Sequence, residues 1–88
     1  MDQKECPPGK EFVFRTPDGK EMGRARNVPE LFANIKTVPL ASVLYHANGK
    51  HFSPWLAMIG EHVLSAKAKV VSGNDDRVRT ALLRLHKI

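Results

Sequence analysis

Prolines and glycines interrupt this chain at short intervals, and their spacing restricts every element that it can form. The turn signals are Pro7-Pro8-Gly9, Pro17-Asp18-Gly19, Pro39, Asn48-Gly49, Gly60 and Ser72-Gly73. The chain of 88 residues is long enough for one domain with one hydrophobic core. We therefore expect an α+β fold in which an N-terminal β-hairpin packs on a small bundle of about three to five short helices.

Residues 1–10 contain two prolines and a glycine, which preclude a helix or a central strand. We expect a flexible N-terminal arm there and a single globular domain over residues 11–88. Within the domain, residues 11–27 predict the hairpin, because two extended stretches flank the turn at residues 17–19. The facing pairs predicted by this turn are Thr16–Lys20, Arg15–Glu21, Phe14–Met22 and Phe12–Arg24.

Helical spacing follows the hairpin. Asn27 suits the N-cap of a helix over residues 27–38, and Ser53 suits the N-cap of a second helix that Gly60 interrupts. Another helix is expected over residues 61–71, and Asn74 or Asp75 is expected to cap the last. The expected core positions are Leu31, Phe32, Ile35 and Val38 in the first, Val63, Ala66 and Val70 beside Leu64, Ala68 and Val71 in the third, and Val78, Ala81, Leu82 and Leu85 in the last.

Residues 40–53 allow two interpretations. Leu40, Val43 and Leu44 have helical spacing, and Asn48-Gly49 would then end the helix. The same Asn-Gly pair between extended stretches is also a strong hairpin signal. The helix is favoured, with the hairpin as the alternative.

The excess of positive charge is concentrated near the C-terminus. The chain has 14 Lys and Arg against 9 Asp and Glu, a formal net charge of +5, and residues 45–88 hold 7 basic and 3 acidic side chains. A basic helix can neutralise phosphates, so the last helix is a candidate nucleic-acid surface. Its candidate residues are Arg77, Arg79, Arg84 and Lys87, with His86 beside them. The alternative is a solvated face that serves solubility.

The hairpin is a second possible nucleic-acid surface. In the predicted register, Phe12 and Phe14 share a face with Arg24 and Arg26, and interleaved aromatic and basic side chains can bind a single strand. The alternative, which we favour, places both phenylalanines in the core.

Side chains able to do chemistry are densest at Tyr45, His46, His51, Phe52 and Trp55. Histidines five residues apart do not match the usual spacing of metal ligands, so no metal or cofactor is expected. An acid–base site would require Tyr45, His46 and His51 to meet in an open cleft. The alternative is that the histidines form hydrogen bonds with the backbone while Phe52 and Trp55 fill the core. No catalytic motif is present, and we expect no enzyme activity.

Cys6 is the single cysteine, so no disulfide can form within the chain. Residues 1–5 are polar, unlike a secretory signal, and the longest apolar stretch, residues 55–59, is too short to span a bilayer. A cytoplasmic protein with no membrane contact is therefore expected.

The run Val28-Pro29-Glu30-Leu31-Phe32, with Ile35, Val38-Pro39, Tyr45-His46 and Phe52-x-x-Trp55-Leu56, resembles a small prokaryotic domain family of unknown function. The resemblance covers roughly residues 11–71 and is most specific at Tyr45-His46 and Phe52-x-x-Trp55. It implies the order extended pair, helix, Val-Pro, Tyr-His, Phe-x-x-Trp-Leu. It implies no activity, and it makes the cluster of Tyr45, His46, His51, Phe52 and Trp55 a possible shared site.

These observations favour a small non-enzymatic module that binds a protein partner. Leu83 is the candidate contact, because it is expected to project from the basic face of the last helix. The alternative function is a nucleic-acid accessory protein that uses the basic C-terminal helix.

Overall fold

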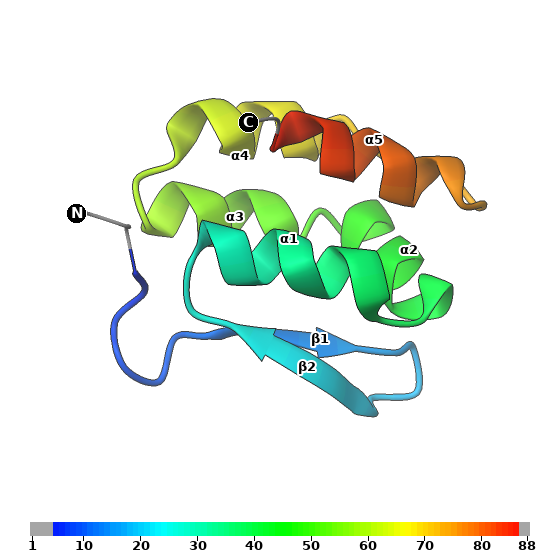
Figure 1. Cartoon of the computed structure of the whole chain (residues 1–88), viewed down its shortest axis with the longest axis horizontal. Helices are drawn as coiled ribbons and strands as arrows, with labels where there is room; N and C mark the ends of the chain where they lie inside the picture. Colours follow the sequence, from blue (N-terminus) through cyan, green and yellow to red (C-terminus); the bar gives the residue numbers. More distant parts are fainter. Residues whose placement is uncertain (1–4, 87–88) are drawn as a thin grey trace.

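Residues 5–86, the part of the chain that the computed structural model describes, form two strands followed by five helices (Figure 1). The antiparallel hairpin is one layer, with α1 packed on β2 and α2 packed on β1. α4 and α5 form the opposite layer, on the far side of α1, α2 and α3. The expected α+β fold is confirmed. The elements are β1 (Phe12–Arg15), β2 (Glu21–Ala25), α1 (Val28–Thr37), α2 (Leu40–Asn48), α3 (Phe52–Met58), α4 (His62–Lys69) and α5 (Arg77–Leu85).

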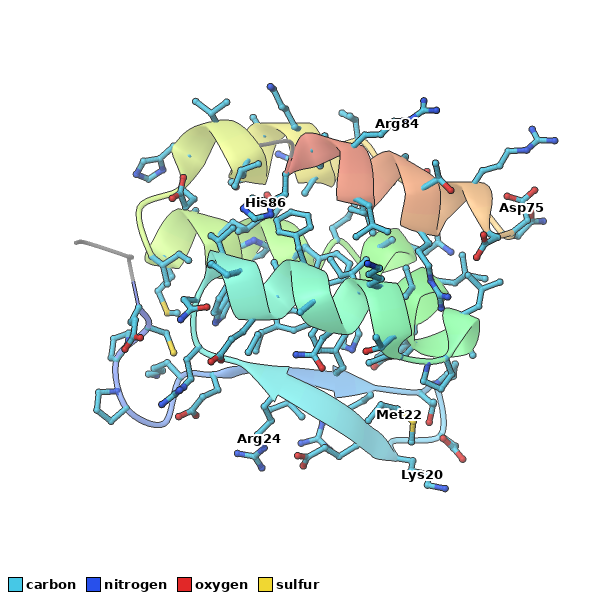
Figure 2. The ribbon with its side chains drawn as sticks, in the orientation of Figure 1. Lys20, Met22, Arg24, Asp75, Arg84 and His86 are labelled. Carbon is cyan, nitrogen blue, oxygen red and sulfur yellow. The ribbon has the colours of Figure 1, made fainter. Side chains whose placement is uncertain are left out.

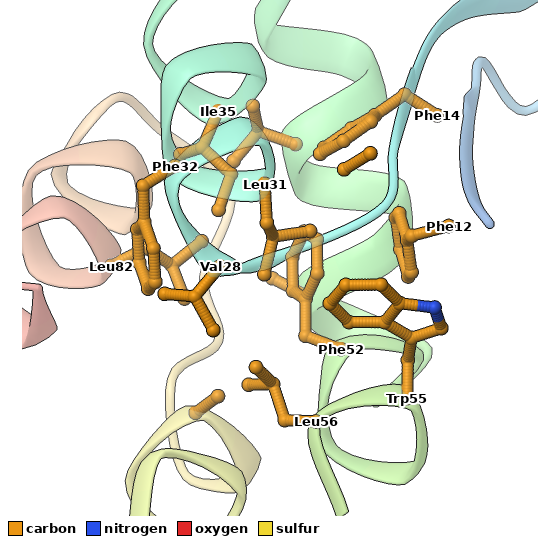
Figure 3. Packing of buried hydrophobic residues seen from close by; sticks show 14 of the residues in the cluster. Phe12, Phe14, Val28, Leu31, Phe32, Ile35, Phe52, Trp55, Leu56 and Leu82 are labelled. Atoms are coloured by element: carbon orange, nitrogen blue, oxygen red, sulfur yellow. The ribbon is translucent and has the colours of Figure 1, made fainter. Parts of the chain in front are cut away.

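The core extends from the hairpin through α1, α2 and α3 to Ala68 of α4 and to Val78 and Leu82 of α5 (Figure 3). The rings of Phe12 and Phe52 stack with centroids 5.0 Å apart, and Trp55 meets Phe12 edge-on at 5.9 Å. The indole N–H of Trp55 donates to the carbonyl of Lys10 over 2.8 Å, which satisfies its one polar atom. Aromatic packing therefore joins β1 to α3.

The predicted hairpin register is correct at the turn and wrong beyond it. Arg15 pairs with Glu21 as expected, but a β-bulge then inserts Met22, so that Phe14 faces Gly23 and Phe12 faces Ala25. Gly23 lies close to α1, because a β-carbon at residue 23 would lie 2.5 Å from Oδ1 of Asn34. A larger residue facing Phe14 would therefore require the Asn34 side chain to move.

The bulge also reverses which side chains face the core, since a shift of one residue changes the face of every residue beyond it. Phe12, Phe14 and Ala25 are buried, whereas Arg24 is exposed and forms an ion pair with Glu21 at 2.7 Å. Figure 2 shows Lys20 and Arg24 pointing away from the helices. The possible nucleic-acid surface that joined Phe12 and Phe14 to Arg24 is therefore wrong.

The first two helices follow their sequence signals. Asn27 caps α1, its Oδ1 accepting the N–H of Glu30 over 3.0 Å, and all four predicted core residues of residues 27–38 are buried. Residues 40–48 form α2, so the helical interpretation of residues 40–53 is confirmed and the hairpin is wrong.

The predicted start of α3 is wrong, and the predicted core face of α4 is wrong in part: Leu64, Ala68 and Val71 face the core as expected, but Val63, Ala66 and Val70 do not. α3 begins at Phe52, with Ser53 inside it rather than at its N-cap. The Ser53 hydroxyl lies 2.8 Å from that of Ser65, and Ser65 also hydrogen-bonds the carbonyl of Ser53. Because this contact turns Ser65 and Ala68 inward, it leaves Val63, Ala66 and Val70 exposed.

The last helix and the arm keep their predicted roles in part. Val78 and Leu82 are buried in α5, and Asp75 accepts the backbone N–H of Arg77 over 3.0 Å, although Asp76 holds the N-cap position.

Residues 5–10 contact the domain: the N–H of Cys6 donates to the carbonyl of Arg26 over 2.9 Å. The expected flexibility of the arm stays a prediction.

Candidate functional site

The fold gathers Tyr45, His46 and His51 at the C-terminal end of α2. Their ring centroids lie 5.0 to 5.2 Å apart in all three pairs. Phe52 and Trp55, the other members of the predicted cluster, are buried behind them in the core. The cluster is therefore real in space, but it divides into a buried aromatic part and an outer part with Tyr45 and His51 exposed to solvent.

His46 is almost fully buried, and its hydrogen bonds define where its proton lies. Its Nε2 accepts the backbone N–H of Arg15 over 2.8 Å, so this nitrogen is unprotonated. A neutral ring then carries its proton on Nδ1. Burial, with the charges of His51 and Arg15, lowers the pKa of His46 to about 4, so the ring is neutral at pH 7.

The proton of His46 in turn defines the state of His51. The two Nδ1 atoms lie 3.0 Å apart, and because His46 donates, His51 accepts. The neutral His51 ring therefore carries its proton on Nε2. A general base would need a free lone pair at Nε2, which is the reverse of this arrangement. The geometry disfavours the acid–base hypothesis with His51 as base.

The same hydrogen bonds disfavour a metal between the two rings. Joint ligation would require a lone pair on the Nδ1 atom of each histidine. In His46 this atom carries the proton, because Nε2 accepts the N–H of Arg15. Residues 5–86 contain no group of three or more His, Cys, Asp or Glu side chains arranged to hold a metal ion.

The turn after α2 places the His51 ring. The N–H groups of Lys50 and His51 donate to the carbonyls of Ala47 and His46, which is a Schellman motif with Lys50 in the left-handed conformation at φ 60°. Glycine usually occupies the left-handed position of this motif. In this chain the glycine is Gly49, one residue earlier, with φ −81°. A β-carbon at residue 49 would lie 2.5 Å from Nε2 of His51. A larger residue at position 49 would therefore displace the ring of His51, although its own backbone conformation suits any residue.

A pocket of about 540 Å³ opens beside this cluster. We call it the α2 pocket. Its floor is α2 and its wall is the hairpin turn, and it is lined by Pro17, Ala41, Leu44, Tyr45, Asn48 and His51, with Gly49.

The four basic candidates do not form one free surface. Arg77 and Arg84 are exposed, but the guanidinium of Arg79 is largely covered and donates to the carbonyl of Val38 at the end of α1. Asp75 and Asp76 lie within 4 Å of Arg77 and Arg79. Lys87 lies outside the described residues, and the ring of His86 stacks on Phe32 with centroids 4.7 Å apart.

Leu83 does not project into solvent as expected. It is partly buried and packs against the hydrophobic core. The helical wheel places Leu83 beside the basic residues of α5. In the fold, however, the side of α5 that carries Leu83 packs against the hydrophobic core.

The sequence interpretation missed the most exposed large apolar residues near α4. Val63 is 67% exposed and Val70 is 77% exposed. A signal was present, because Lys67 falls within the apolar arc that was expected to face the core. The α4 face, which we define as Val63, Ala66, Lys67 and Val70, is therefore solvent-facing.

A second pocket, of about 470 Å³, adjoins the α4 face where the chain passes from α4 to α5. We call it the α4–α5 pocket. Its apolar lining is Val70, Val71, Val78 and Ala81. The charged residues Asp75 and Arg77 also line it. Val70 belongs to both, so the α4 face and this pocket are continuous.

No helix within residues 5–86 is long and apolar enough to cross a membrane. No protein family model matches the chain, and no curated protein or solved structure matches it either.

Proposed function

We propose that this protein is a small cytoplasmic, non-enzymatic module that binds a partner protein through the α4 face. The observation that carries the proposal is the exposure of Val63 and Val70 on one side of a helix whose other side holds Ser65 and Ala68. Single exposed apolar residues are ordinary, but two valines seven residues apart lie on the same helix face. Covering both would contribute roughly 1.5–3 kcal/mol for each side chain fully buried.

The α4–α5 pocket supplies an anchor point for such a partner. Most binding energy in protein interfaces comes from a few large side chains that enter pockets, while their surroundings exclude water. A partner residue in this pocket would contact Val70, Val71 and Val78, and its neighbours would lie along α4.

The charges around the α4 face favour an acidic partner. Residues 62–86 hold Lys67, Lys69, Arg77, Arg79 and Arg84 against Asp75 and Asp76. The two aspartates lie near Arg77 and Arg79, and the other three cations have no carboxylate within 4 Å among the described residues. Free cations at the rim of an interface accelerate association with an acidic surface.

Nucleic-acid binding by α5 has less support, because Arg79 is held by the carbonyl of Val38 and only Arg84 of the described candidates is both exposed and unpaired. A phosphate-binding helix needs several free cations on one face, with affinity that falls steeply as salt rises.

Site-specific photo-crosslinking in the native cell tests the proposal. A photoreactive residue replaces Ala66 on the α4 face, and the matched control replaces Ala33, an exposed alanine on α1. We expect a discrete protein adduct at position 66 that is absent at position 33 and is lost when Val63→Asp and Val70→Asp are added. Adducts that are the same at both positions, or a nucleic-acid adduct at position 66, would contradict the proposal.

A further inference from the structure

The α2 pocket is separate from the α4 face, and its lining has a distinct chemistry. Most of it is apolar, from Pro17, Ala41 and Leu44. Its polar lining side chains are those of Tyr45, Asn48 and His51, and none is acidic. Asp18, which follows Pro17, accepts the hydroxyl proton of Thr16, and this hydrogen bond lowers the pKa of Asp18.

The Asn48 amide is already engaged with the backbone of Gly73 through one N–H and one lone pair. Its Nδ2 donates to the carbonyl of Gly73 over 2.7 Å, and its Oδ1 accepts the N–H of Gly73 over 3.0 Å. The side chain thus joins α2 to the segment before α5. The polar lining atoms with no hydrogen-bond partner at all within residues 5–86 are the hydroxyl of Tyr45 and Nε2 of His51.

The hydrogen bond from His46 makes His51 a donor. Because Nδ1 of His51 accepts the proton of His46, Nε2 presents an N–H and not a lone pair. An isolated exposed histidine exchanges its proton between the two nitrogens, whereas this pair holds the arrangement in place. The pocket therefore combines an apolar floor, one fixed N–H donor and one hydroxyl.

We propose that the α2 pocket binds an apolar molecule that carries a carboxylate, with the apolar body on Ala41 and Leu44 and the carboxylate accepting hydrogen bonds from Nε2–H of His51 and the Tyr45 hydroxyl. Hydrogen bonds to an ionised acceptor are roughly twice as strong as neutral ones. A ligand with a cationic head would meet the Nε2–H donor of His51, and the lining offers it no carboxylate.

The backbone of the turn determines where the His51 ring lies. Lys50 keeps the left-handed conformation, which is costly for a residue with a β-carbon, although the adjacent residue is glycine. The glycine instead stands at residue 49, where it makes room for the His51 ring. The local sequence thus favours the position of His51 over the stability of the turn.

Benzoate and benzylamine test the proposal, because they share an aromatic body and differ in the charge of the head. Each is titrated into the ¹⁵N-labelled protein while backbone amide resonances are followed by NMR. We expect benzoate to shift the resonances of Leu44, Tyr45, Gly49 and His51 in a saturable manner, and benzylamine to leave them unchanged. No shift with benzoate, or equal shifts with benzylamine, would overturn the proposal.

Three variants assign the effect to His51. His51→Phe keeps a ring and removes the donor, and Gly49→Ala displaces the ring while its φ of −81° suits alanine. Both should weaken benzoate binding about fivefold or more, which is the loss of one net hydrogen bond of about 1 kcal/mol. His62→Phe, a matched change at an exposed histidine on α4, should bind benzoate like the wild type. Unchanged binding in His51→Phe would contradict the assignment.

Discussion

α1 and α4 both carry apolar side chains at helical spacing. Those of α1 face the core, whereas Val63 and Val70 on the α4 face are exposed to solvent. In α1, Leu31 and Ile35 are buried and connect the hairpin to α5. In α4, Ser65 and Ala68 face the molecule and the valines face solvent. Small inward residues allow α4 to pack closely on α3, and Leu64 packs against the core beside them. Val63 and Val70 are left exposed. α1 therefore serves the fold, and α4 offers a surface.

The largest expected effect is in α1. Leu31→Ala removes a fully buried side chain from the centre of the core, and such changes cost about 3–5 kcal/mol because a cavity remains. Chemical denaturation measures the free energy of unfolding. Val63→Ala is the matched change on α4 and should cost no more than about 0.5 kcal/mol. Equal losses in the two variants would show that α1 and α4 do not differ in this way.

Acid should destabilise the protein through His46. The folded pKa of about 4 lies below the ordinary value near 6.5, so the unfolded chain binds more protons between these values. The free energy of unfolding therefore has its full value above about pH 6.5. It falls by up to about 3 kcal/mol as the pH drops to 4.

A His46→Gln variant isolates this effect. Glutamine can still accept the N–H of Arg15 but does not titrate, so the decline between pH 6.5 and 4.5 should flatten. The ion-paired Glu21 and Glu30 have lowered pKa values and affect stability only at more acid pH. An undiminished decline in the variant would assign the acid sensitivity to other groups.

Two buried serines should respond in opposite directions. Ser65 orients α4 through Ser53, and Ser65→Ala should cost about 1–2 kcal/mol because it leaves the Ser53 hydroxyl without its partner. Ser42 in α2 is fully buried, and its hydroxyl has no hydrogen-bond partner within the described residues. Ser42→Ala should be neutral or stabilising. Thermal unfolding compares the two variants, and a greater loss in Ser42→Ala would contradict these assignments.

A small stabilising effect is expected at the turn that places His51. Lys50→Gly relieves a left-handed residue and should stabilise the protein by about 0.5–1 kcal/mol. Because residue 49 is unchanged, the His51 ring should keep its contact with His46. A loss of stability would show that the Lys50 conformation carries no strain.

The sequence predicted what local chemistry determines. The asparagine cap of α1, its apolar stripe, the turn at residues 17–19 and the interruption at Gly60 all depend on neighbouring residues, and each is present. The bulge at Met22 accompanies the approach of Asn34, and the face of α4 depends on a contact between Ser53 and Ser65. Such contacts between distant residues leave no periodic signal in the sequence.

The candidate sites also divide into features set by neighbouring residues, which the sequence predicted, and features set by distant contacts, which it did not. Tyr45, His46 and His51 lie close together along the chain, and their grouping was visible in the sequence. Their protonation depends on the N–H of Arg15, which is 31 residues from His46 and visible only in the structure. Leu83 and Arg79 seemed exposed on a helical wheel, because a wheel cannot show that they pack against the core and against the end of α1.

The central claim, that Val63 and Val70 face solvent and do not stabilise the fold, is tested most directly by the free energy of unfolding of the Val63→Asp, Val70→Asp double variant. Charged residues at exposed positions should change this quantity by no more than about 0.5 kcal/mol, with an unaltered circular dichroism spectrum. A loss of about 3 kcal/mol or more would mean that both valines are buried in the native protein, and would contradict the claim.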